Sequence, residues 1–219
     1  MDPHYEHELR VLQMRFIGKI IAGFTHEIKN YIAIINESTG LIGDMMKLGK
    51  SPEHDLPAYL DIIHSIEDHI EKANVHFRYL NRFAHRMDTP RSSVMINEGV
   101  EELIALLKRF ANQKRITLHE EYESDLPLVD TNPSLLQLVL FTCMEKYMME
   151  CEPNSTITIQ TARADRSILI TIMPRGIQTE VSGVSIPHAL LDNIIKDIGG
   201  TISQDSDKRT IIALPLGNP

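Results

Sequence analysis

Apolar residues recur at alternating spacings of four and three through the first half of the chain, the pattern of a helix that buries one face. One series runs from Ile17 to Met45 and a second from Tyr59 to Met87. Between them, Leu48 to Pro52 contains a glycine and a proline, which are typical of a break between helices. The two series predict an antiparallel hairpin of two long helices. The first series consists of Ile17, Ile21, Phe24, Ile28, Tyr31, Ile35, Ser38, Ile42 and Met45.

Further apolar residues widen both faces of the predicted hairpin: Ile20, Ile34 and Leu41 on the first helix, and Ile62 and Phe83 on the second. Two helices cannot enclose faces this wide, so more helices are needed. A second copy of the chain would supply them and form a dimeric four-helix bundle with two-fold symmetry. The alternative is that the hairpin packs on the rest of its own chain.

The pattern changes after about residue 90. Alternation of apolar and polar residues in segments such as Ile168 to Ile172 is typical of half-buried antiparallel strands. We therefore predict an α+β fold with two domains, a helical hairpin over 1–90 and an α/β sandwich over 91–219. The predicted helices of the sandwich cover about 97–113, 133–151 and 187–198, and the predicted strands about 116–122, 155–163, 167–173, 201–205 and 209–214.

Composition narrows the classes of function. The 219 residues, 42% of them hydrophobic, are enough for two compact units. No apolar run is long enough to span a membrane, and the N-terminus lacks a leader pattern, so we expect a cytoplasmic protein without membrane contact. A net charge of −8 argues against nucleic-acid binding. Cys143 and Cys151 are expected to be reduced and structural.

His26 lies off the predicted apolar face. It is two residues from both Phe24 and Ile28, and at about 100° per residue its imidazole points away from the core. An exposed imidazole is a good nucleophile and phosphoryl acceptor at cellular pH. Its neighbours suit that chemistry: Glu27 could orient the ring or take up its proton, Lys29 could offset phosphate charge, and Asn30 could position a water or a phosphoryl oxygen.

Small residues follow the same helical face. Ala22, Gly23, Ala33 and Gly40, together with Glu37, would let the backbone of another protein approach closely, so we predict partner contacts there. An equally simple interpretation is that small residues occur on this face by chance. A zinc site of the His-Glu-x-x-His type is excluded because position 30 is asparagine, and no metal site is predicted.

The segment Ile20 to Asn30 resembles the phosphoacceptor motif of bacterial sensor histidine kinases. Asp125-Leu126-Pro127, Gly199-Gly200-Thr201 and Ala213-Leu214-Pro215 resemble landmarks of the catalytic domain in that family. The resemblance implies a dimerisation hairpin followed by an α/β sandwich of the histidine-kinase ATPase type. It also implies that His26 carries the phosphoryl group, that Glu27 is its acid-base partner and that Asn30 orients a dephosphorylating water.

The nucleotide site departs from the family pattern. Phe141 or Glu145 falls where the metal-binding asparagine belongs, and Pro174 replaces the adenine-binding aspartate. The segment between Gly176 and the glycine-bearing Val181 to Ser185 is too short for the usual lid. Without these groups nothing would hold adenine, magnesium or the transferred phosphate. We therefore expect that the chain binds no cofactor and is not an ATP-dependent autokinase.

A phosphoacceptor hairpin joined to a degenerate ATPase-like domain is similar to the dimeric histidine phosphotransferases of phosphorelays. This resemblance implies transfer between receiver-domain aspartates through His26, with Mg²⁺ on the receiver domain. The expected partners are response-regulator receiver domains and a second copy of the chain, with a sensor kinase as a further candidate. The alternatives are a pseudokinase or scaffold, a phosphatase partner acting through Asn30, and an atypical sensor histidine kinase.

Overall fold

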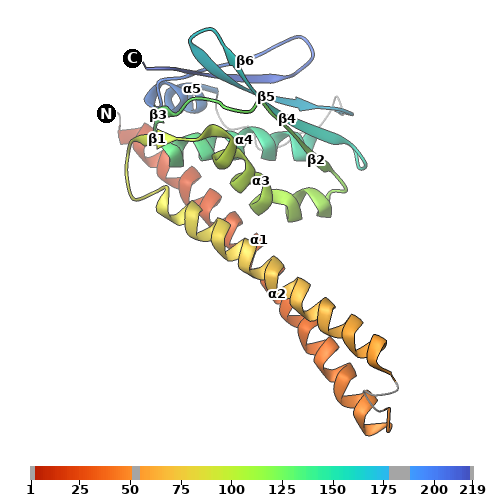
Figure 1. Cartoon of the computed structure of the whole chain (residues 1–219). Helices are drawn as coiled ribbons and strands as arrows, with labels where there is room; N and C mark the ends of the chain where they lie inside the picture. Colours follow the sequence, from red (N-terminus) through yellow and green to blue (C-terminus); the bar gives the residue numbers. More distant parts are fainter. Residues whose placement is uncertain (1–2, 51–54, 178–187, 218–219) are drawn as a thin grey trace.

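The computed structural model describes residues 3–50, 55–177 and 188–217. A long helical hairpin is followed by an α/β sandwich (Figure 1). The hairpin consists of α1 (Pro3–Lys47) and α2 (Leu56–His85), which lie side by side and run in opposite directions. The predicted fold class, a helical hairpin followed by an α/β sandwich, is confirmed. The first helix begins earlier than its apolar series indicated.

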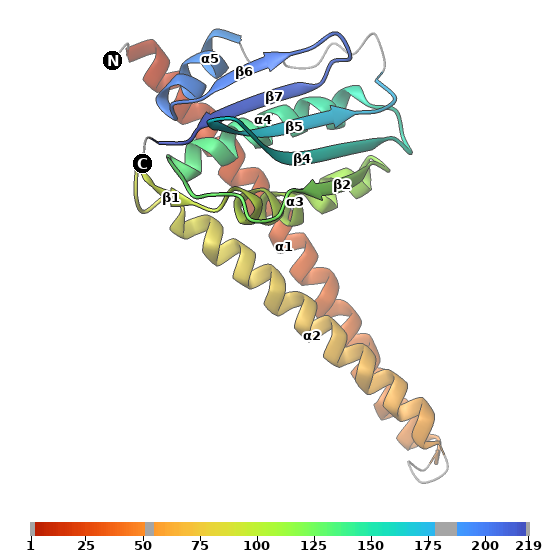
Figure 2. The ribbon, with the colours of Figure 1, turned by 45° about the horizontal axis from the view of Figure 1, so that its top comes forward.

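One five-stranded sheet forms a layer of the sandwich (Figure 2). Its order is β2-β4-β5-β7-β6; β2 pairs in parallel with β4, and the other pairs are antiparallel. A separate antiparallel pair, β1 and β3, was not predicted, because three residues are too few to show alternation. The strands are β1 (Ser92–Val94), β2 (Thr117–Tyr122), β3 (Val129–Thr131), β4 (Thr156–Ala164), β5 (Ser167–Pro174), β6 (Thr201–Gln204) and β7 (Thr210–Pro215).

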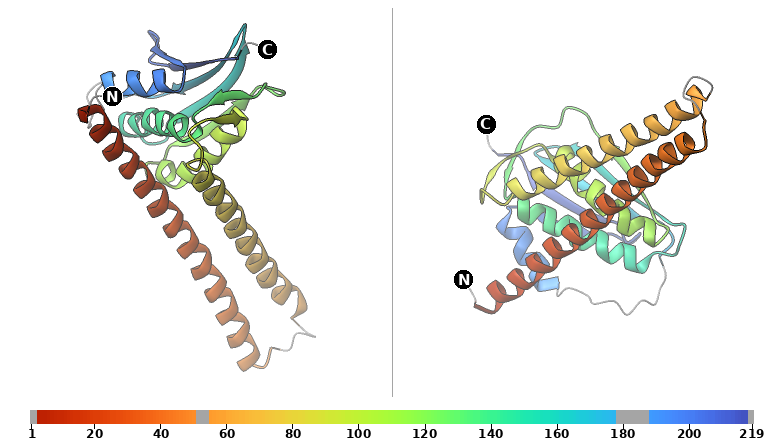
Figure 3. Two further views of the ribbon diagram at one scale, coloured as in Figure 1. Left: turned by 90° about the vertical axis from the view of Figure 1, so that its left-hand side faces the viewer. Right: turned by 90° about the horizontal axis from the view of Figure 1, so that it is seen from below.

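Three helices, α3 (Ile96–Gln113), α4 (Pro133–Glu150) and α5 (His188–Asp197), cover one face of the sheet (Figure 2). The side chain of Asn132 caps α4 by accepting a hydrogen bond from the Leu135 amide at 3.0 Å. Helix α4 is buried on nearly every side, which fits its apolar sequence. The sheet lies against one side of α4, and α1 lies against another (Figure 3).

The hairpin and the sandwich share one hydrophobic core. Ile168, Ile170 and Ile172 of β5 are fully buried, as the alternation predicted. The same core continues into the base of the hairpin through Leu12, Phe16, Ile20 and Phe83. The Phe16 ring lies 4.6 Å from Phe141 of α4 and 5.2 Å from Phe83 of α2, centroid to centroid. At its base, therefore, the hairpin packs on its own chain.

This packing corrects the predicted buried face of α1. Ile21, placed in the buried series, is 50% exposed, whereas Ile20 is completely buried. The reason is that α1 has two apolar faces. One contacts α2 along the hairpin, and the other, in the N-terminal half of α1, contacts the sandwich. A periodicity that assumes one partner cannot distinguish them.

Farther from the sandwich the two helices contact only each other among the described elements (Figure 1). Four apolar residues of α2 spaced by seven are 40–52% exposed there. They are Leu56, Ile63, Ile70 and Phe77. A heptad spacing of this kind marks one continuous stripe along a helix, and we call these four residues the α2 stripe.

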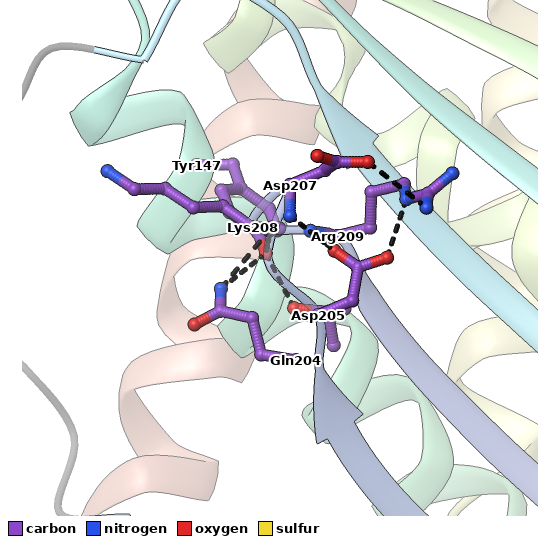
Figure 4. A network of polar contacts seen from close by, with 7 residues as sticks. Tyr147, Gln204, Asp205, Asp207, Lys208 and Arg209 are labelled. Carbon is purple, nitrogen blue, oxygen red and sulfur yellow. Dashed lines mark hydrogen bonds and ion pairs between the residues drawn. The ribbon is translucent and has the colours of Figure 1, made fainter.

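At the opposite end of the molecule, polar contacts hold the turn between β6 and β7 (Figure 4). Asp205 accepts hydrogen bonds from the amides of Asp207 and Arg209 and from the Arg209 side chain. The Tyr147 hydroxyl bonds Thr210 Oγ1 at 2.6 Å. These contacts tie α4 to the far edge of the sheet.

Burial affects the acidity of both cysteines. It raises the pKa of the Cys143 thiol to about 12, and burial together with Glu150 raises that of Cys151 to about 11. Both thiols are free and stay protonated at neutral pH. In the described part of the chain, none of the helices has the length and apolar character needed to cross a membrane.

Candidate functional site

His26 lies midway along α1, just beyond the part of the helix that packs on the sandwich. Its side chain is exposed, as its position off the apolar face predicted. Among the described residues, none forms a hydrogen bond or ion pair with the imidazole. The ring is therefore open to a partner molecule.

Glu27, beside His26, is paired with a cation of the sandwich. Its Oε1 lies 3.5 Å from Nη1 of Arg109 on α3, and the pair is largely buried, with side-chain exposures of 25% for Glu27 and 15% for Arg109. Tyr31 lies one turn further along α1. Burial, followed by the negative charge of Glu27, raises the pKa of Tyr31, so its phenol stays a donor.

Helix α2 supplies the residues opposite this part of α1. The Phe24 and Phe77 rings lie 5.1 Å apart in an edge-to-face arrangement, and the Tyr31 and His76 rings lie 5.4 Å apart. The Nδ1 atom of His76 is bonded to the Lys72 carbonyl at 3.0 Å. These ring contacts keep the two helices in register at the level of His26.

Most of the other residues predicted for catalysis and partner contact are exposed. Lys29, Asn30, Ala33, Glu37 and Gly40 are exposed and form a continuous face with Ala22. Their roles stay predictions.

Gly23 requires a correction. A Cβ atom built there would lie 2.7 Å from Cε2 of Phe110 on α3. The close approach that this glycine permits is therefore made by the same chain and not by a partner protein.

Two residues of α4 that the resemblance places near the metal-binding position, Phe141 and Glu145, contact α1. Phe141 packs against Phe16, and the Glu145 side chain is only 7% exposed. Its carboxylate binds two cations from α1: Nη2 of Arg15 lies 3.0 Å away, and Lys19 Nζ contacts the other oxygen. Glu145 thus faces a pair of fixed protein cations.

The segment that follows β5 folds back on the sandwich. Gly176 adopts a φ of +74°, and a Cβ there would lie 2.6 Å from Ser155 Oγ. Its carbonyl accepts a hydrogen bond from the Glu152 amide at 2.9 Å. The backbone at 173–177 therefore closes onto the connection between α4 and β4. The remainder of the predicted short lid, 178–187, lies outside the described residues.

Sequence reasoning missed the cations that join the two halves. Arg15, Lys19 and Arg109 all looked like solvated residues on helix faces, and the contact between Arg109 and Glu27 spans 82 residues of sequence. Only Phe110 gave a local signal, because it is a large apolar residue near the end of an amphipathic helix. Within the ranges that the structure describes, no cluster of three or more histidine, cysteine or acidic residues is arranged to hold a metal ion.

Comparison with known proteins shows the class of fold. No protein-family model and no curated protein matches the chain. The catalytic domain of the histidine kinase ThkA, in a nucleotide-free form, superposes with a TM-score of 0.51 at 15% sequence identity, covering 58% of this chain and 98% of that domain. A second nucleotide-free form gives 0.50 at 16% identity, covering 58% and 96%.

ThkA crystallised with the response regulator protein TrrA matches 99% of this chain and 68% of its own, at 19% identity and a TM-score of 0.49. The α/β sandwich of this chain resembles a histidine-kinase catalytic domain, and a long helical hairpin precedes it.

Proposed function

We propose that this chain is a histidine-kinase-like protein of two-component signalling and that His26 carries the phosphoryl group. The observation that carries the proposal is the placement of His26: an exposed imidazole on the hairpin, next to a carboxylate that forms an ion pair with Arg109. A nucleophile flanked by an oriented acid-base group is the arrangement that covalent catalysis needs.

The chemistry proceeds in two balanced steps. The unprotonated ring nitrogen of His26 attacks the phosphorus of an aspartyl phosphate, the P–O bond breaks, and its electron pair leaves with the donor carboxylate. The proton on the other ring nitrogen passes to Glu27. In the second step, the acceptor aspartate attacks the same phosphorus, the P–N bond breaks with its electron pair returning to the ring, and Glu27 returns the proton.

We propose further that the phosphoryl donor is a receiver-domain aspartate and not ATP. Support comes from Glu145, one of the two residues, with Phe141, that the resemblance puts at the metal-binding position: its carboxylate is engaged by Arg15 and Lys19. Phe141 and Phe16 fill the neighbouring space. Magnesium would then be bound by the receiver domain, and this chain would contribute the nucleophile and the docking face formed by Ala22, Asn30, Ala33, Glu37 and Gly40.

A second candidate is an atypical histidine kinase. The likeness of the sandwich to the ThkA catalytic domain favours this candidate, because ThkA is a histidine kinase. A pseudokinase or scaffold keeps the same surfaces without transfer, and a phosphatase partner would use Asn30 to orient a water molecule.

Incubation of the purified chain with phosphorylated receiver domains and, separately, with magnesium-ATP distinguishes these functions. We expect acid-labile label on His26 from a receiver, no label from ATP alone, and complete loss of label in His26→Ala. Label from ATP alone would establish the kinase alternative. Receiver binding without label would establish the scaffold. Loss of receiver phosphate without label on His26, abolished in Asn30→Ala, would establish the phosphatase.

A further inference from the structure

Among the described residues, three ionic contacts, each centred on one carboxylate, join the hairpin to the sandwich, and one of them differs from the others. Two bury a carboxylate of the sandwich under cations of the hairpin: Glu145 under Arg15 and Lys19, and Glu102 under Arg86. The third has the opposite polarity, because its carboxylate, Glu27, belongs to the hairpin and its cation belongs to α3. This third contact is the one next to His26.

The end of α3 is placed against α1 by packing. Phe110 fills the space left by Gly23, one helical turn before Glu27 on α1. This contact fixes the neighbouring residue, Arg109, at the level of Glu27. Because both side chains of the ion pair are largely shielded from water, the attraction between them is screened less than in an exposed pair.

The contact also limits the motion of Glu27. A glutamate on a helix surface has three rotatable side-chain bonds and loses little by leaving any one position. Here one oxygen is met by the guanidinium of Arg109 at 3.5 Å. The carboxylate is therefore confined beside the residue that carries the phosphoryl group.

We propose that Arg109 is a positioning residue for phosphoryl transfer: it acts through Glu27 and holds that carboxylate where it can take up the His26 proton. The inference rests on the function proposed above. It assigns the sandwich a role without nucleotide, as the support that carries α3 and its arginine to the phosphoacceptor. Positioning of this kind raises reaction rates by large factors, because a small displacement of a reacting group slows the reaction strongly.

A double-mutant cycle tests the inference. The rate of His26 phosphorylation is measured in the full chain with Glu27→Gln, Arg109→Gln, both changes together, and Arg109→Lys. Phosphoramidate, a small phosphoryl donor, is used so that no partner protein is needed. Arg209→Gln is the matched control, because Arg209 forms an ion pair with Asp205 in the distant β6–β7 turn.

We expect Arg109→Gln to slow loading by about 10-fold or more while leaving the KM for phosphoramidate unchanged. The same change in the Glu27→Gln background should have no further effect, Arg109→Lys should retain part of the rate, and Arg209→Gln should match the wild type. Thermal unfolding followed by circular dichroism shows whether each variant is folded, and Arg109→Lys serves if Arg109→Gln is not.

Three results overturn the inference: no slowing in Arg109→Gln, an equal slowing with and without Glu27, or a wild-type His26 that phosphoramidate does not load. Failure of the proposed function is recognised separately. In that case phosphoramidate loads His26 and the Arg109 effect is present, but receiver domains neither give label to His26 nor accept it.

Discussion

Glu145 is a buried carboxylate whose two cationic partners come from the other end of the chain. Arg15 and Lys19 are 35% and 39% exposed, whereas the carboxylate is 7% exposed. The arrangement is asymmetric: a cation that loses its partner can turn to water, but the carboxylate cannot. The cost of breaking the cluster therefore depends on which member is removed.

Replacing both cations should destabilise the protein more than replacing the two cations and the carboxylate together. We expect Arg15→Met with Lys19→Met to lower the free energy of unfolding by about 3 kcal/mol, because an unpaired carboxylate is left buried. Adding Glu145→Leu should restore most of that loss. Urea unfolding measures both. In the control, Arg78→Met removes an exposed pair with Glu71 and should cost less than about 1 kcal/mol. A triple variant no more stable than the double would contradict this account.

At the scale of elements, α1 is a single helix with three different neighbours. Ile20 and Phe16 face the sandwich, Phe24 and Tyr31 face α2, and His26 faces solvent. The contact with the sandwich depends on Gly23, where Phe110 leaves no room for a side chain.

Two glycines of α1 should respond to substitution in opposite directions. Gly23→Leu should lower the free energy of unfolding by about 1–3 kcal/mol, because the new side chain overlaps Phe110. Gly43→Ala should raise it by about 0.5–1 kcal/mol, because alanine favours the helix and nothing lies within 4 Å of its Cβ. Denaturant unfolding measures both. If Gly23→Leu were as stable as the wild type, α3 would not be packed closely on α1.

The elements themselves could be predicted because their signals are local. The helical period between Phe24 and Met45 and the alternation in β5 need no knowledge of distant residues, and both agree with the structure. The exposure of His26 follows from the same helical angle. The short strands β1 and β3 were not predicted, because their pairing is set by the surrounding tertiary structure.

The surroundings of His26 could not be predicted in the same way. Arg109 is one of several charged residues on an amphipathic helix, and nothing near it in sequence indicates contact with Glu27. The burial of Ile20 and Gly23 likewise depends on where the sandwich docks, which periodicity does not specify. The sequence therefore indicated the exposed histidine but not the residue that pairs with its neighbour.

In the molecule as a whole, the hairpin is held against the sandwich at one end and is exposed toward the other. Near the sandwich, the shared core and the three ionic contacts hold the hairpin. Toward the tip, the α2 stripe remains 40–52% exposed. Exposed apolar residues in heptad register are the usual contact between helices of a bundle, and we propose that a second copy of the chain covers them.

Charge placed in the α2 stripe should therefore separate the dimer. We expect Ile63→Lys with Ile70→Lys to sediment as a monomer at micromolar concentration while keeping its helical circular dichroism. Asp61→Lys with Asp68→Lys is the matched control, because these residues are exposed on a different face of α2 and should leave the dimer intact. Sedimentation velocity measures both. A dimer that survives the first pair of changes must associate through another surface.

The three neighbours of α1 also bear on ancestry. Between Phe16 and Tyr31, successive residues in turn contact the sandwich, contact the second helix or flank the exposed His26, so few substitutions satisfy all three. Elsewhere a helix or strand contacts one or two neighbouring elements, and its sequence can change more. Distant descendants of a common ancestor should thus remain recognisable longest in this window of about four helical turns, after the rest of the chain has diverged beyond detection.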